Sequence, residues 1–123
     1  MTIIEAINTI DALYPNTYLQ EKKIEQLSKL DAVIKRDIID KHEGSEDVTF
    51  NGYDENTPLD TVLLVPAPYD DVYVFWLQMW IDYWNGEIGR YNNSTSMYSK
   101  AYSNFERAYN REHMPKATKI NYF

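Results

Sequence analysis

Residues 69–84 read Tyr-Asp-Asp-Val-Tyr-Val-Phe-Trp-Leu-Gln-Met-Trp-Ile-Asp-Tyr-Trp, the densest apolar and aromatic run in the chain. At 100° per residue, one face of a helix collects six of these side chains: Tyr69, Val72, Tyr73, Trp76, Trp80 and Tyr83. The opposite face collects Asp71, Gln78, Asp82 and Asn85, with Phe75 among them. The period of 3.6 residues therefore predicts an amphipathic helix over 69–85, which starts after Pro68 and stops at Gly86.

This aromatic helix is predicted to be the central helix of the core. Aromatic side chains bury about 150–250 Å² each, so the helix can supply much of a small domain's hydrophobic stabilisation. Leu77, Ile81 and Trp84 widen its apolar face beyond what one neighbouring helix covers. Either several helices wrap it, or part of it meets another subunit. An aromatic platform for bases or sugars is the alternative, which the acidic flank disfavours for nucleic acid.

Three further helices follow from capping signals and apolar periodicity. Thr2 and Glu5 fit a capping box for a helix over 2–13, and Thr17 with Gln20 repeats that signal for a helix over 17–42. The break at Pro15 makes these two an αα-hairpin. An N-cap within Asn92-Asn93-Ser94 predicts a fourth helix over 94–112, separate from the third because the intervening residues are poor helix formers.

Two segments stand apart from the helices. Residues 43–68 read as a long loop with one or two short strands, in which Asn51-Gly52 permits a β-hairpin and the apolar run 62–65 pins the end to the body. Residues 114–123 form an extended tail that alternates basic and apolar residues, so we expect it to dock on a partner. We therefore expect a mainly α fold, with residues 1–123 as one domain.

Composition bounds the class of protein. The absence of cysteine excludes disulfides and thiolate chemistry, and no apolar run reaches the ~18 residues of a membrane span. The chain is expected to be soluble and intracellular where it is made. Its net charge of −7 is segregated: residues 43–89 carry −10 and residues 90–123 carry +4. This division favours either a solvated acidic surface or an acidic patch that meets a basic patch on a neighbouring copy.

No residue pattern indicates catalysis, a metal or a cofactor. His42 and His113 lack ligand spacing and are expected at helix C-terminal ends, where a cation suits the dipole. Asp70 and Asp71 are interpreted as first-turn carboxylates that interact favourably with the helix dipole. Residues 54–60 partly resemble a calcium-binding loop, but Pro58 and the missing Gly and bidentate Glu do not fit that pattern. An enzyme is not expected. A hydrolase built on acidic residues would require divalent-metal binding, for which no ligand set is found.

The whole chain resembles the small head–tail adaptor proteins (connector or head-completion proteins) of tailed bacteriophages and of prophages of Gram-positive bacteria. The matching elements, in chain order, are Thr2-Ile3-Ile4-Glu5-Ala6-Ile7, Pro15-Asn16-Thr17-Tyr18, His42-Glu43-Gly44, Phe50-Asn51-Gly52-Tyr53, Leu64-Val65-Pro66-Ala67-Pro68-Tyr69-Asp70-Asp71, Tyr83-Trp84-Asn85-Gly86-Glu87, Tyr91-Asn92-Asn93-Ser94 and His113-Met114-Pro115-Lys116. The chain departs from this pattern in the extra tryptophans Trp76, Trp80 and Trp84.

The resemblance implies a structural subunit that assembles as a ring, typically a dodecamer, beneath the phage portal protein. Such a ring joins the DNA-filled capsid to the tail and adjoins a tail-proximal connector or stopper protein. DNA would only pass through its channel, without sequence-specific binding, and no membrane is involved. The expected location is the head–tail interface of the virion, and the host cytoplasm during assembly.

In that family the long loop and the terminal tail are the usual contact elements. Carried over, the resemblance and the charge pattern nominate these interface residues: Phe50, Tyr53, Asp54, Glu55, Arg107, Arg111, Lys116, Lys119, Ile120, Tyr122 and Phe123. The alternative is a monomeric helical regulatory module that presents the loop to one protein partner. A ring subunit should expose its tail and two unlike patches, whereas a monomeric regulator should bury its aromatic residues.

Overall fold

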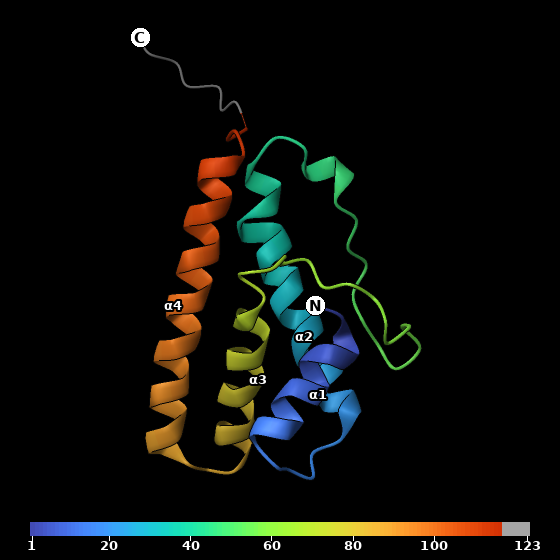
Figure 1. Ribbon diagram of the computed structural model, residues 1–123. Coiled ribbons are helices and arrows are strands. Elements are labelled where there is room, and N and C mark those ends of the chain that lie inside the picture. Colours follow the sequence, from blue (N-terminus) through green and yellow to red (C-terminus); the bar gives the residue numbers. More distant parts are fainter. Residues whose placement is uncertain (117–123) are drawn as a thin grey trace.

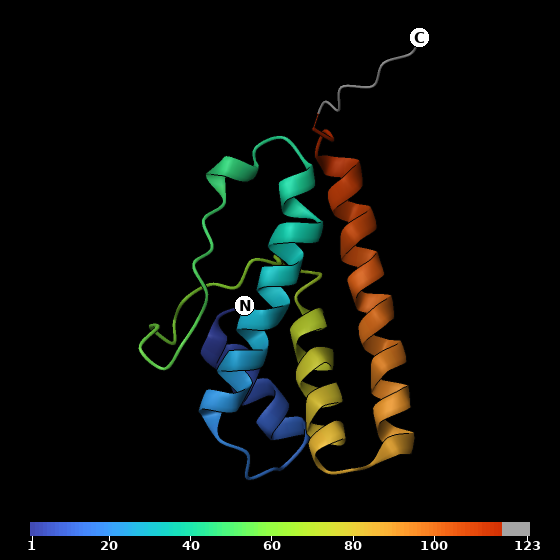
Figure 2. The same ribbon diagram turned by 180° about the vertical axis from the view of Figure 1, so that it is seen from behind.

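A computed structural model of the protein describes residues 1–116, and its architecture is a small, mainly α bundle (Figure 1). Its helices are α1 (Ile3–Leu13), α2 (Gln20–Asp37), α3 (Asp71–Trp84) and α4 (Ile88–Glu112), with two short 3₁₀ helices, η1 (Ile39–Lys41) and η2 (Ser45–Asp47). The chain reverses direction between α1 and α2, and again between α3 and α4 (Figures 1 and 2). The predicted fold class is confirmed. Within residues 1–116 no helix is both long and apolar enough to span a bilayer.

Helix α3 is the core helix, as predicted, and it packs against α1, α2 and α4. The predicted inward face is correct only in part: Val72 and Tyr73 are fully buried as predicted, but the centre of the buried face lies elsewhere. Leu77, Ile81 and Asp82 are almost fully buried, whereas Tyr83 is 58% exposed. Trp76 and Trp80 lie half-buried at the surface. Because apolar side chains surround this helix nearly completely, periodicity leaves its rotation undetermined, and the three neighbouring helices set it.

The predicted break between the third and fourth helices is confirmed, but the fourth helix begins earlier than expected. Gly86, at φ +72°, makes the turn after α3, and α4 starts at Ile88 rather than at residue 94. The expected N-cap was wrong because Ser94 is 1% exposed inside the bundle. Its hydroxyl donates to Asp82 Oδ2 over 2.5 Å, so packing against α3 overrides the weak helix propensity of residues 92–94.

Of the two N-caps predicted for the first two helices, one is confirmed and the other is wrong. Thr2 caps α1, since its Oγ1 accepts from the Glu5 amide at 3.2 Å. The corresponding prediction for Thr17 was wrong, and α2 begins three residues after it. The reason is that Asn16 Oδ1 accepts from the Tyr18 amide at 3.2 Å, a local turn that keeps residues 14–19 out of the helix. At its far end α2 stops at Asp37 and tightens into η1.

The loop 43–68 runs along the outer side of α1 and α2 (Figures 1 and 2). The described residues contain two isolated β-bridges, Thr2–Val62 and His42–Pro115, and no hairpin at Asn51-Gly52. Here the expected short strands were wrong. Instead of forming a hairpin ladder, the loop makes short turns and bonds to α1, as when the amide of Ile3 donates to the Thr61 carbonyl at 3.0 Å. The expected anchor is confirmed by the burial of Leu63 and Val65.

Candidate functional site

The middle of the loop is attached to α2 through a buried carboxylate. Asp31 is completely buried and accepts hydrogen bonds from the hydroxyls of Tyr53 and Tyr73, each at 2.5 Å. It also accepts from the Leu64 amide at 3.1 Å. Burial raises the pKa of Asp31 above its ordinary value, and these hydrogen bonds oppose part of that rise. One side chain therefore holds two separate points of the loop against the helix.

Sequence reasoning missed Asp31, although a signal was present. Leu27, Leu30 and Ile34 mark the apolar stripe of α2, and Asp31 falls on that stripe rather than on the charged outer face. A carboxylate in such a position requires partners, because a buried charge without hydrogen bonds is very costly. The sequence could have nominated Asp31, but it could not have named the two tyrosines.

The four predicted loop residues lie together beside this anchor. Phe50 and Tyr53 make an edge-to-face contact with ring centroids 5.1 Å apart. Asp54 and Glu55 are exposed at the loop tip. The tip is locally fixed, because Asp54 Oδ1 accepts from the Asn56 amide at 2.8 Å. These residues form a loop tip that is ordered by local contacts and carries two exposed carboxylates.

The tip adjoins two carboxylates of α2 that sequence reasoning did not include. Asp54 and Glu55 line a shallow cavity of about 260 Å³ together with Glu21 and Glu25. We call Glu21, Glu25, Asp54 and Glu55 the acidic surface. Only Glu25 forms an ion pair within residues 1–116, with Lys29 at 3.3 Å. The acidic surface therefore carries net negative charge available to a cationic partner.

The two predicted arginines of the chain's last third lie on α4. Arg107 and Arg111 are exposed and line a cavity of about 320 Å³ with Tyr69 and Asn104. We call Arg107 and Arg111 the basic surface. Arg107 Nη2 donates to Asn104 Oδ1 at 2.9 Å, and within residues 1–116 neither guanidinium lies within 4.0 Å of a carboxylate. Both cations are thus open to an anionic partner.

The two charged surfaces belong to opposite sides of the molecule. Helix α4 forms one edge, and the loop around residues 50–60 forms the other, with α2 and α3 between them (Figures 1 and 2). The structure therefore brings the predicted loop residues together and keeps them away from the arginines. Lys116 lies beside the end of η1, where its amide donates to the Lys41 carbonyl at 3.0 Å. Lys119, Ile120, Tyr122 and Phe123 lie outside the described residues.

The two histidines occupy helix ends, as the sequence predicts. Nδ1 of His42 lies 2.6 Å from the Ile38 carbonyl, and Nδ1 of His113 lies 3.2 Å from the Tyr109 carbonyl. The structure also brings them near each other, with ring centroids 6.3 Å apart. Within residues 1–116 no group of three or more His, Asp or Glu side chains is placed to hold a metal ion.

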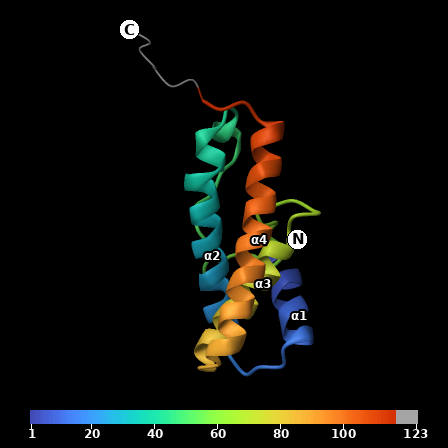
Figure 3. The ribbon, with the colours of Figure 1, turned by 90° about the vertical axis from the view of Figure 1, so that its left-hand side faces the viewer.

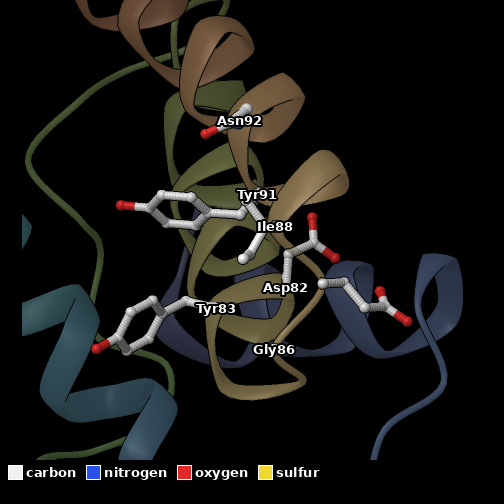
Figure 4. A pocket seen from close by; sticks show the side chains of 7 residues that line it. Asp82, Tyr83, Gly86, Ile88, Tyr91 and Asn92 are labelled. Carbon is white, nitrogen blue, oxygen red and sulfur yellow. The ribbon is translucent and has the colours of Figure 1, made fainter.

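A further cavity of about 350 Å³ lies where α3 turns into α4 (Figure 4). Tyr83 and Tyr91 project on one side of Ile88, and Asp82 lies on its other side (Figure 4). The Asp82 carboxylate is buried, although the sequence placed it on the solvent face. Only one of its oxygens has a partner among the described residues, namely Ser94. This cavity is chiefly an apolar hollow in the exposed end of the bundle.

Comparisons of this chain with family models, with curated proteins and with solved structures find no match.

Proposed function

We propose that this protein is a structural subunit of a phage head–tail connector, which assembles as a ring through its acidic and basic surfaces. The acidic surface of one copy binds the basic surface of the next, and repetition of this contact closes the ring. The ring lies beneath the portal protein, above a tail-proximal connector or stopper, and DNA passes through its channel. The resemblance of the whole chain to head–tail adaptors supports the role.

The observation that carries the proposal is the placement of unlike charges at opposite edges of the bundle (Figure 1). Two different surfaces that complement each other make a heterologous contact, which closes into a ring where the rotation between neighbouring copies closes and otherwise runs on as a filament. A pair of like surfaces would make a two-fold dimer instead. The separation of Asp54 and Glu55 from Arg107 and Arg111 therefore suits a ring rather than a dimer.

The hydrogen bonds that hold the loop tip also support the proposal. A flexible tip would lose conformational entropy on binding, at about 0.5–1.5 kcal/mol for each immobilised side chain. Here Asp31 already holds Tyr53, and the Asp54 turn already orients the tip. The acidic surface is consequently preorganised for a partner.

A charge-swap experiment tests the contact. One variant carries Arg107→Glu and Arg111→Glu, and the other reverses the whole acidic surface with Glu21→Lys, Glu25→Lys, Asp54→Lys and Glu55→Lys. We expect each variant alone to be monomeric in native mass spectrometry, because like charges then face each other across the contact. An equimolar mixture should assemble again, since every interface in an alternating ring regains opposite charges.

The matched control carries Arg90→Glu and Lys100→Glu, which changes the net charge equally on the same helix. It should assemble like the unmodified protein. Unmodified protein that stays monomeric up to about 1 mM, where contacts worth about 4 kcal/mol are half formed, would contradict self-assembly through these surfaces. That result would favour the monomeric regulatory module. Mixed variants that fail to assemble while the control does would refute the heterologous pairing.

A further inference from the structure

A buried carboxylate lines the cavity between α3 and α4 without a cation to balance its charge. Asp82 is 1% exposed, and its Oδ2 accepts from the Ser94 hydroxyl. Its Oδ1 is buried and has no hydrogen-bond donor among residues 1–116, and none of their cationic groups lies within 4.0 Å of Asp82. Because a buried charge is costly unless it is paired and hydrogen-bonded, Oδ1 marks a place where a cationic donor would lower the free energy.

The cavity beside Asp82 is shaped by the turn that joins α3 to α4. This turn lies at the end of the bundle opposite to the C-terminal end of α4 (Figure 3). Gly86 makes the turn, and the Glu87 amide closes it by donating to the Asp82 carbonyl at 3.0 Å. The volume of the cavity, about 350 Å³, falls in the range of small-molecule sites. The hollow is therefore already formed before a ligand arrives.

The rest of the lining favours a ligand with an aliphatic body. Tyr83 and Tyr91 pack against each other with ring centroids 5.7 Å apart, on one side of Ile88 (Figure 4). Ile88 lies between these rings and Asp82, and it is 73% exposed. Because so little of Ile88 is packed, its side chain can turn to another rotamer at small cost and open the way to Oδ1. An alkyl chain laid on these three side chains would remove apolar surface from water.

The single free oxygen of Asp82 favours an ammonium over other cations. A guanidinium binds a carboxylate best through two parallel hydrogen bonds, but Ser94 already occupies Oδ2. A divalent cation needs several oxygen ligands, and the chain as described, residues 1–116, gathers no three His, Asp or Glu side chains that could hold a metal. An ammonium is a compact charge that can donate to one oxygen alone.

We propose that this cavity binds a primary alkylammonium group, with the ammonium donating to Asp82 Oδ1 and the alkyl chain lying on Tyr83, Ile88 and Tyr91. Glu87, also in the lining, is paired with Arg90 at 3.4 Å, so the attracting charge is that of Asp82. Two sources share this chemistry, a free aliphatic amine and a lysine side chain of a partner protein. The site is separate from the acidic and basic surfaces, so the inference does not depend on ring assembly.

Titration of the full chain with hexylammonium, followed in two-dimensional amide NMR spectra, tests the site. The comparison ligand is 1-hexanol, which has the same alkyl chain without the charge. We expect saturable shifts of the Glu87 and Tyr91 amides, and binding of hexylammonium at least about tenfold tighter than that of 1-hexanol, since hydrogen bonds between ions are much stronger than neutral ones. Similar affinities for the two ligands, or shifts that do not saturate, would overturn the proposal.

A charge-removing variant tests the assigned residue. Asp82→Asn keeps the shape of the side chain, and it should lower the affinity for hexylammonium to that for 1-hexanol. The matched control, Asp71→Asn, makes the same change at an exposed position at the other end of α3 and should leave both affinities unchanged. An unchanged affinity in folded Asp82→Asn protein would refute the assignment. Should that variant not fold, the comparison of the two ligands on the unmodified protein still decides the proposal.

A third ligand separates the two sources of the ammonium. Nα-acetyl-lysine amide presents the same group on a side chain that is attached to peptide units. An affinity equal to or above that of hexylammonium assigns the cavity to a lysine side chain of a partner. A lower affinity assigns it to a free amine, because the peptide units then do not fit beside the turn.

Discussion

The buried carboxylate of Asp31 is predicted to hold the long loop against α2, and its removal should lower the free energy of unfolding. Replacing Asp31 with Ala removes the acceptor for two tyrosine hydroxyls and for the Leu64 amide. Each hydrogen bond to a charged group contributes about 1.5–3 kcal/mol, while removal of the carboxylate also removes the cost of burying its charge, which is several kcal/mol. The net loss in the free energy of unfolding should be about 2–4 kcal/mol.

Urea unfolding followed by tryptophan fluorescence measures this loss. The control is Glu25→Ala on the exposed face of α2, where one surface ion pair is lost and the expected cost is at most about 0.5 kcal/mol. Hydrogen exchange adds a local readout: the amides of Tyr53 and Leu64 should exchange faster in the Asp31 variant. A stability change for Asp31→Ala no larger than that of the control would refute the assigned role.

The same residue predicts a pH dependence. Burial raises the pKa of folded Asp31 above the ordinary value of 3.8, so between these two values the folded chain keeps a proton that the unfolded chain has lost. This contribution to stability is complete below pH 3.8 and is lost as the pH rises through the folded pKa. Asp31→Asn should remove that part of the slope in a pH series of unfolding measurements. An unchanged slope would contradict the titration of Asp31.

Substitutions at four other positions test the fold. Leu77→Ala in the core should cost about 2–5 kcal/mol in urea unfolding, whereas Ile88→Ala, at a side chain 73% exposed, should cost under about 1 kcal/mol; similar costs would contradict the burial of Leu77 and the exposure of Ile88. Thr2→Ala should lower stability by about 0.5–2 kcal/mol, and Thr2→Ser should restore most of it if the hydroxyl cap is responsible. Gly52→Ala should cost about 1–2 kcal/mol, because Gly52 has φ +86°, which a residue with a side chain adopts only with strain. The added methyl would make only an ordinary contact with Ser28, so an unchanged urea midpoint would rule out this backbone cost.

In the sequence, the resemblance to head–tail adaptors and the segregation of charge predicted interface residues rather than an active site. The structure shows where these predicted residues lie: Asp54 and Glu55 are on the loop at one edge of the bundle, and Arg107 and Arg111 are on α4 at the other. It also adds Glu21 and Glu25, which are far from the loop in sequence. Assembly of the chain into a ring stays a prediction that the charge swap tests.

The sequence by itself determined how many long helices this chain forms and approximately where each one lies. Apolar periodicity, the Thr2 cap and the breakers Pro15 and Gly86 act over a few residues, so they can be read without a fold. The number of helices, the central place of α3 and the burial of Leu63 and Val65 were predictable for that reason.

Only the tertiary structure decided which way those helices face and what holds the loop. Helix α3 is apolar almost all round, so its rotation, which buries Leu77 and exposes Tyr83, depended on three neighbours acting together. The early start of α4 is accompanied by the hydrogen bond from Ser94 to Asp82, and the position of the loop depends on the hydrogen bond from Tyr53 to Asp31. These contacts join residues distant in sequence, and their free energy outweighs the local propensities of about 1 kcal/mol or less that a sequence displays.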